Sequence, residues 1–245
     1  MSTPHTAAEP TPAVVGLHVW TIPRAGIASA VGRLAVDRFR LRGYPGLTFA
    51  KLLGSGSGQT FAPQDADPHH WALLTCWDTP HAATTFERSS VVQRWDAAAT
   101  ERLRITMRPL SSMGHWSKRQ PFGPTAPPAS APAAAGPIAS ITRARIQPSQ
   151  LRSFWRSVPG VAAELSAADG LIWSKGIGEA PIGLQGTFSV WRDADALRRF
   201  AYESPCHQQA ITSTRETGWF AEELFARFSV LAIDGTIDGA PLQVT

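Results

Sequence analysis

The chain has 245 residues, of which 23 are Lys or Arg and 19 are Asp or Glu, so its formal net charge is +4. Apolar residues make up 43% and charged residues 17%, which is typical of a globular protein and excludes a wholly disordered chain. No apolar run approaches the roughly 18 residues of a membrane-spanning helix, and residues 1–13 lack the basic start and apolar middle of a secretion signal. We therefore expect a soluble, cytoplasmic protein.

Simple motif tests exclude several common kinds of site. The cysteines, Cys76 and Cys206, lie in no CxxC pair and in no Cys/His cluster with zinc spacing, so we expect neither a disulfide framework nor a zinc site. The basic residues are scattered, which gives no support to a nucleic-acid partner. The GSGSG loop at 54–58 lacks the Gly-Lys-Ser/Thr ending of a phosphate-binding loop.

In the first half, the hydrophobic pattern predicts the order β-α-β-β-α-β. The expected elements are a strand at 14–21, a helix at 25–41, strands at 46–54 and 70–77, a helical segment from Thr79 to about Ala99 with a break near Ser89–Ser90, and a strand at 102–110. The second half repeats this order. Its expected elements are a strand at 138–146, a helix after Pro148, strands at 170–175 and 184–191, a helix from Asp193 that is interrupted at Ser204–Pro205 and resumes to about Thr214, and a strand at 224–231.

Residues that recur at fixed separations indicate an internal repeat. The matched pairs are Gly46/Gly170, Lys51/Lys175 and Gly54/Gly178, each separated by 124 residues, and Trp77/Trp191 and Phe86/Phe200, each separated by 114 residues. The difference of ten falls in the loop that follows Gly54, where an insertion is easily tolerated.

These observations predict an α+β protein made of two ferredoxin-like repeats, which bury their apolar sheet faces against each other as an intramolecular dimeric α+β barrel. We expect a disordered tail at 1–13, the first repeat at 14–119, a Pro/Ala-rich linker at 120–136, the second repeat at 137–235 and a C-terminal tail at 236–245.

His207 stands out among seven histidines because it shares one helical face with Ala210, Ile211 and Thr214. One interpretation is a buried histidine bonded to a backbone carbonyl. The other is a metal ligand: haem iron takes four bonds from the porphyrin and needs one protein atom, whereas zinc needs three or four ligands, and none are grouped here. The first half has Gln93 at this position, so we expect only one of the two helix–sheet clefts to bind in this way.

Other polar signals are weaker. Strand alternation puts Leu171, Trp173 and Lys175 on one face, and Gln185, Thr187, Ser189 and Trp191 on one face of the next strand. The Lys175 cation and the Gln185 amide could therefore approach one ligand, although a surface lysine is an equal alternative. Arg215 could meet a haem propionate, or it could form a solvated pair with Glu216.

The stretches WSKGIGEAPIGLQGTFSVW (173–191), SPCHQQAITSTRETGWFAEELFARFSVL (204–231) and KLLGSGSGQTFAP (51–63) resemble the spheroidene monooxygenase family of acyclic carotenoid ketolases. This resemblance implies a haem-b protein that uses O2 and electrons from a redox partner such as ferredoxin to oxygenate an apolar polyene. It also implies that His207 is the iron ligand, as in related dimeric α+β barrel proteins.

Our first hypothesis is accordingly a haem-dependent monooxygenase. We expect His207, Arg215, Trp173, Phe188 and Ile211 to contact the cofactor, and Gln185 and Lys175 to be catalytic. A haem-dependent dehydratase or peroxidase that acts on an N–O or O–O bond, and a non-catalytic haem or small-molecule carrier, are the alternatives. Contact with a membrane surface and oligomerisation stay open.

Overall fold

The computed structural model describes residues 9–56, 65–124, 136–179 and 184–244. The elements of the first half are β1 (Val14–Thr21), α1 (Ile27–Arg40), β2 (Leu47–Gly56), β3 (Ala66–Trp77), α2 (Pro80–Phe86), α3 (Ser90–Asp96) and β4 (Glu101–Gly114). Those of the second half are β5 (Ile138–Ile146), α4 (Leu151–Ser166), β6 (Leu171–Gly178), β7 (Leu184–Trp191), α5 (Ala194–Glu203), α6 (Pro205–Thr217) and β8 (Phe220–Gly235). The predicted order of elements is confirmed, and so are both predicted helix breaks.

Local sequence explains where several helices begin. The side chains of Thr79, Ser89 and Asp193 accept hydrogen bonds from backbone N–H groups in the first turns of α2, α3 and α5. Pro205 starts α6, where its missing N–H is not needed, and Gly218 ends that helix in the left-handed conformation at φ 61°. Helices α5 and α6 are therefore two short helices that meet at Ser204.

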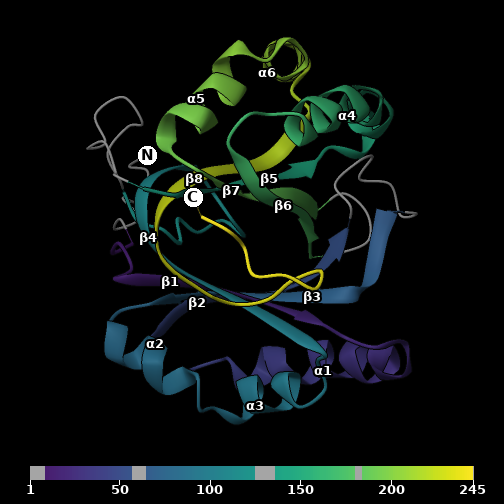
Figure 1. Ribbon diagram of the computed structural model, residues 1–245. Helices are drawn as coiled ribbons and strands as arrows, with labels where there is room; N and C mark the ends of the chain where they lie inside the picture. The colour runs from purple at the N-terminus through teal and green to yellow at the C-terminus, as the bar shows by residue number, and fades with distance from the viewer. Residues whose placement is uncertain (1–8, 57–64, 125–135, 180–183, 245) are drawn as a thin grey trace, which may run out of the picture.

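The eight strands close into one antiparallel barrel in the order β1-β3-β2-β6-β7-β5-β8-β4. Each half contributes four adjacent strands, and the halves join through the pairs β2–β6 and β4–β8. Helices α1, α2 and α3 lie on one side of the barrel and α4, α5 and α6 lie on the opposite side (Figure 1). The predicted α+β barrel is confirmed, whereas the origin of its halves as copies of one module stays a prediction.

The recurring glycines that reveal the two halves have a steric cause. Gly46 and Gly170 both have positive φ angles. A Cβ added at Gly46 would lie 2.5 Å from the Cβ of Ala82, and a Cβ added at Gly170 would lie 2.6 Å from the Cβ of Ala196. Both positions thus let the chain pass close to the start of a helix before it enters a strand.

The barrel interior is an apolar core to which both halves contribute. Phe122 is fully buried in it and contacts the ring of Phe228 edge-on, at 4.8 Å between ring centroids. The predicted linker at 120–136 therefore begins too early, because composition cannot show that one aromatic residue beside a Pro-rich stretch returns to the core. Ile237 is also buried, so the predicted C-terminal tail at 236–245 packs on the barrel over part of its length.

Among the described residues, no helix has both the length and the apolar character needed to cross a membrane. The linker residues 125–135 and the tail residues 1–8 lie outside the described part of the chain.

In the first half, aromatic side chains fill the space between helices and sheet. Trp20, Trp77, Trp95 and Phe86 are almost completely buried there, and Trp20 stacks on Trp95 at 5.2 Å between ring centroids. This packing leaves no room for a large ligand between α1, α2, α3 and their sheet.

A histidine–glutamate pair lies within the same cluster. His18 is buried, and its Nε2 donates a hydrogen bond of 3.0 Å to Glu87. Burial alone would raise the pKa of Glu87, but the hydrogen bond from His18 and the nearby Arg104 and Arg102 outweigh burial and lower the pKa to about 2. Glu87 therefore stabilises the folded state when it is ionised.

We predict that Glu87→Gln lowers the free energy of unfolding at neutral pH by about 1–2 kcal/mol. In the native chain this contribution is present above the ordinary glutamate pKa of 4.5 and is lost as the pH falls toward 2. The variant should therefore lose less stability over this range, which urea unfolding at several pH values measures. Asp195→Asn is the control, since that carboxylate is 75% exposed; equal pH slopes for native chain and Glu87→Gln would contradict the assignment.

Candidate functional site

The helix side of the second half is lined by smaller side chains than that of the first half. The strand registers make the halves comparable, because Val14 pairs with Trp77 just as Ile138 pairs with Trp191. In this comparison, Thr142, Ala144 and Thr187 take the places of His18, Trp20 and Leu73.

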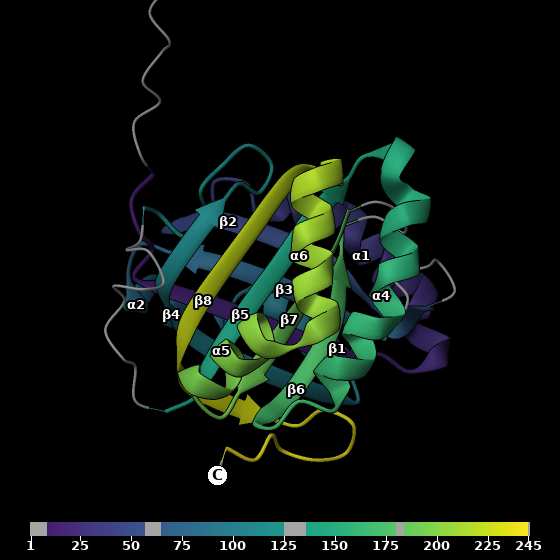
Figure 2. The ribbon, with the colours of Figure 1, turned by 90° about the horizontal axis from the view of Figure 1, so that it is seen from above.

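Solvent exposure shows that α4 and α6 do not close on this sheet. Thr142 lies in the middle of β5, on the sheet face that α4, α5 and α6 cover, and is nevertheless exposed. Thr187, its partner on β7, is only half-buried, and every described residue of α6 is half-buried or exposed. Viewed from above, α4 and α6 cross over β5, β6 and β7 (Figure 2). A recess therefore separates these two helices from the sheet.

His207 lies in the first turn of α6. Its Nδ1 is 2.9 Å from the backbone oxygen of Ala201, and since a carbonyl can only accept, Nδ1 carries the proton and Nε2 keeps a free electron pair. Burial lowers the pKa of His207 and outweighs the opposite effect of this hydrogen bond, so the ring is neutral near pH 7. The ring packs on Phe200, which contacts Trp191 of β7, so His207 lies on the recess side of the sheet.

Glu164 of α4 holds the start of α6. Its carboxylate accepts hydrogen bonds from the backbone N–H groups of Cys206, at 2.9 Å, and His207, at 3.2 Å. Helix α6 has no N-terminal cap from a side chain of its own, so Glu164 replaces one from a neighbouring helix. The helices touch closely here, because a Cβ added at Gly160 would lie 3.1 Å from the Cys206 sulfur. Cys206 packs against α4, in line with the prediction that it is a small packed residue.

Three of the predicted cofactor or catalytic residues face the barrel interior instead. Directly paired residues of an antiparallel sheet share a face, and Lys175 pairs with Phe188, which is fully buried in the interior core. Trp173 packs against that same core, with its ring 6.1 Å from that of Phe188. The expectation that Trp173 and Phe188 contact a ligand beside His207 is therefore wrong for this arrangement.

The same register corrects the expectation that Lys175 and the polar face of the next strand meet one ligand. Thr187, Ser189 and Trp191 alternate with Phe188 and so lie on the recess face, opposite to Lys175. The expectation that Leu171 shares a face with Trp173 and Lys175 is wrong, because an irregularity between Leu171 and Trp173 puts Leu171 on the recess side, beside Trp191. The sequence does not reveal this irregularity.

Lys175 has a structural role at the junction between the halves. Its Nζ lies 2.9 Å from Asp67 of the first half, whose carboxylate also accepts a hydrogen bond of 2.6 Å from His70. Its counterpart Lys51 lies 2.5 Å from Glu179 of the second half. Each of the two recurring lysines thus forms an ion pair with the opposite half.

Of the other predicted site residues, Ile211 is half-buried on the same face of α6 as His207. Gln185 lies in β7 and Arg215 in α6, but their side chains lie outside the described part of the structure. Sequence reasoning did not identify Thr142, Ala144 and Glu164, and it named Thr187 only as one of several residues on a strand face. Extending the alignment of the two halves to β1 and β5 would have revealed the first two as small residues opposite large ones.

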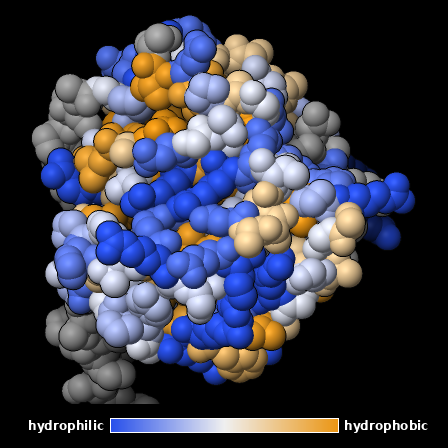
Figure 3. All heavy atoms as spheres, turned by 60° about the horizontal axis from the view of Figure 1, so that its bottom comes forward, coloured by the Kyte–Doolittle hydropathy of each residue, from blue (hydrophilic) through white to orange (hydrophobic). Residues whose placement is uncertain are grey.

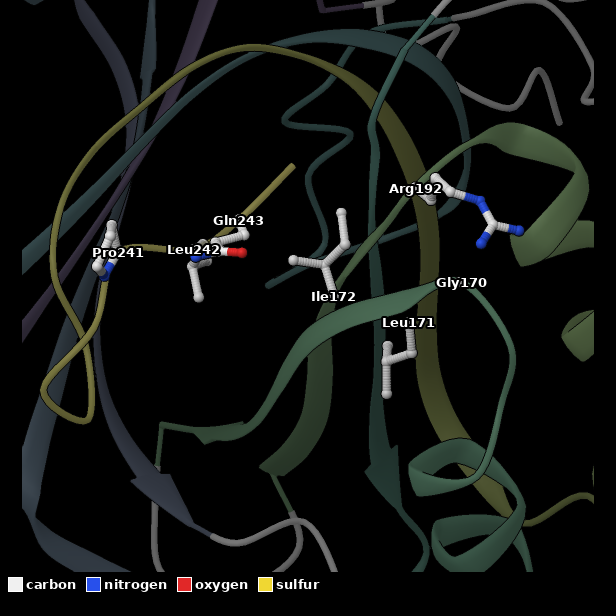
Figure 4. A pocket seen from close by; sticks show the side chains of 7 residues that line it. All are labelled: Gly170, Leu171, Ile172, Arg192, Pro241, Leu242 and Gln243. Atoms are coloured by element: carbon white, nitrogen blue, oxygen red, sulfur yellow. The ribbon is translucent and has the colours of Figure 1, made fainter. Parts of the chain in front are cut away.

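A separate open pocket of about 400 Å³ lies at one end of the barrel (Figure 4). Its lining consists of Gly170, Leu171, Ile172, Arg192, Pro241, Leu242 and Gln243. Arg192 pairs there with Asp169 and Asp193, and His207 is not part of the lining. Within the described residues, no three His, Cys, Asp or Glu side chains form a group able to hold a metal ion. A metal beside His207 would therefore have to bring its other ligands with it.

Comparison with known proteins gives three relatives of the same name. The chain is 35% identical to the spheroidene monooxygenase of Rhodobacter capsulatus over 207 residues, which cover 84% of this chain and 85% of the relative. The enzyme of that name from Rubrivivax gelatinosus is 34% identical, over 85% of this chain and 78% of the relative, and that from Cereibacter sphaeroides is 32% identical, over 85% and 64%. No family model matches the chain.

Among solved structures, an aldoxime dehydratase matches with a TM-score of 0.57 at 13% identity, over 91% of this chain and 84% of the other. An aldoxime dehydratase in complex with butyraldoxime matches with a TM-score of 0.54 at 14% identity, over 89% and 79%. At these identities the likeness shows a shared fold.

The cap formed by Glu164 leads to a local prediction. Glu164→Ala should speed amide hydrogen exchange at Cys206 and His207, since both N–H groups lose their acceptor, and leave exchange in the barrel strands unchanged. Glu203→Ala is a matched control on α5, because that side chain is 59% exposed. Unchanged exchange at both amides would show that Glu164 does not hold α6.

Proposed function

Because the chain belongs to the spheroidene monooxygenase family, we propose that it is a monooxygenase that inserts oxygen from O2 into a carotenoid-like apolar polyene. The observation that carries this proposal is the identity to three enzymes of that name over 84–85% of the chain. The recess beside His207 is the place where we expect the reaction, since it combines an open space with a neutral imidazole.

We further propose that the cofactor is haem b, with His207 as its protein ligand. The residues present fit this group in three respects. His207 is neutral and has a free Nε2 electron pair, as a ligating histidine requires. It belongs to no group of three or more His, Cys, Asp or Glu side chains able to hold a metal among the described residues, and haem iron needs no such group. Trp155 Nε1 on α4, the helix that holds the start of α6, is buried without a hydrogen-bond partner, and an unsatisfied donor of this kind would pair with a polar group of a ligand.

When bound and reduced, haem would supply the activation of O2. The chain's own residues would bind and orient the haem and enclose the space around it. The Ala201 carbonyl fixes which nitrogen of His207 carries the proton, and so directs Nε2 to the ligand. Glu164 anchors the turn of α6 that carries His207. The small side chains of Thr142 and Thr187 leave the space that large residues occupy in the first half.

The electrons would come from a redox protein such as ferredoxin, since a monooxygenase needs an external reductant. This requirement separates the proposal from a dehydratase or peroxidase activity, which would proceed without one. A turnover assay with and without reductase and reductant distinguishes them.

We predict that His207→Ala weakens haem binding at least ~10-fold, since loss of an iron ligand exceeds the effect of losing a residue that only orients it. The Soret absorbance per chain after reconstitution measures this loss, and far-ultraviolet circular dichroism should be unchanged. His81→Ala on α2 is the control, because His81 is exposed on the other side of the barrel. Full haem occupancy in His207→Ala would refute the assignment.

A second prediction concerns the recess. Thr142→Trp should block haem binding by filling this space. It should leave the free energy of unfolding of the haem-free chain nearly unchanged, because Thr142 is exposed. In a closed interface the same change would cost about 1–3 kcal/mol. Thr142→Ser is the matched control and should bind haem normally. A Thr142→Trp chain that binds haem as the native chain does would place the cofactor elsewhere.

A further inference from the structure

The outward face of α1 is apolar along its length. Residues 28, 31, 32, 35, 36 and 39 are Ala, Val, Gly, Ala, Val and Phe, and all are exposed. At 100° per residue they share one side of the helix. We call these six residues the α1 stripe. The exposed fractions of its larger members are 53% for Val31, 47% for Val36 and 52% for Phe39.

Helices of globular proteins normally turn such a face toward the core, yet here another face does so. The inward side of α1 carries Ala30 and Asp37, both fully buried. Asp37 accepts hydrogen bonds from Trp95, Arg94 and Arg40, which fixes the rotation of the helix. The stripe is thus an additional apolar face, and contiguous exposed apolar surface marks an interaction site.

Arginines accompany the stripe. The guanidinium groups of Arg38 and Arg42 lie 4.6 Å and 4.9 Å from the centroid of the Phe39 ring, and Arg40 lies on the other flank with 44% of its side chain exposed. Asp37 is the acidic residue within α1 and is buried, so the exposed surface of this helix carries positive charge without a compensating carboxylate of its own.

We propose that α1 is an interfacial helix that binds the surface of an anionic lipid bilayer. The flanking arginines would contact the anionic lipid headgroups, and the apolar face would enter the boundary with the acyl chains. A second copy of the chain fits less well, because a symmetric contact would bring arginines together. A folded acidic protein fits less well, because the stripe itself is apolar and only the flanking arginines offer directional bonds.

The position of α1 suits this role. It lies on the side of the barrel opposite α4, α5 and α6, so docking leaves the recess beside His207 uncovered (Figure 1). With the bottom of that view brought forward, hydrophobic patches appear among hydrophilic side chains on the surface (Figure 3). Helix α1 has 14 residues and is too short to cross a bilayer, so it lies along the surface.

The test is sedimentation of the full chain with vesicles of phosphatidylcholine, alone or mixed with phosphatidylglycerol. We expect binding to the anionic vesicles that weakens with added salt. Val31→Ser with Phe39→Ser should reduce the partition coefficient at least ~10-fold, since two large apolar side chains no longer enter the lipid. Arg38→Gln with Arg42→Gln should reduce it ~5-fold for each arginine removed.

Matched controls come from α5, where Tyr202 is 55% exposed and Arg198 has 56% of its side chain exposed. Tyr202→Ser with Arg198→Gln should bind vesicles as the native chain does. His207→Ala should also bind normally, so a failure of the haem proposal is distinguishable from a failure of this one. Absent binding to anionic vesicles, or binding unaffected by the stripe variants, would overturn the proposal, as would a dimer that only the stripe variants dissociate.

Discussion

The gap between α6 and its sheet depends on side-chain size at a few strand positions. Where the first half packs His18, Trp20 and Leu73 beneath its helices, the second half has Thr142, Ala144 and Thr187. Protein interiors tolerate few voids, so a helix layer held off its sheet exposes backbone and side chains unless something else fills the space. The same barrel geometry thus gives a packed core on one side and an open recess on the other.

The reactive group beside the recess is His207, and its position depends on the contacts that hold the start of α6. Helix α5 ends at Glu203 and Pro205 starts α6, which brings His207 close enough to the Ala201 carbonyl to fix its proton on Nδ1. Glu164 fixes the first turn of α6 from the neighbouring helix. A neutral imidazole with one nitrogen hydrogen-bonded and the other free is the arrangement in which histidine binds metals, which supports the proposal that His207 holds a cofactor that carries its other ligands.

Much of the fold could be predicted from the sequence because its signals are local. Hydrophobic spacing located the helices, whose starts and breaks fall at the capping residues Thr79, Ser89 and Asp193, and recurring glycines helped to reveal the two halves. The site was harder, because the face on which Trp173 and Lys175 lie depends on how one strand is shifted against the next. Phe122 shows the same limit: burial of one residue beside a Pro-rich segment is decided by distant packing.

The most direct test of the account is a haemin titration of the purified chain, followed by absorption spectra of the reduced protein with and without carbon monoxide. Among the described residues, only the second half offers both a recess and a histidine at this position of its helix, so we expect saturation at one haem per chain with the spectrum of a histidine-ligated iron. Saturation at two per chain, or no specific binding at all, would contradict it.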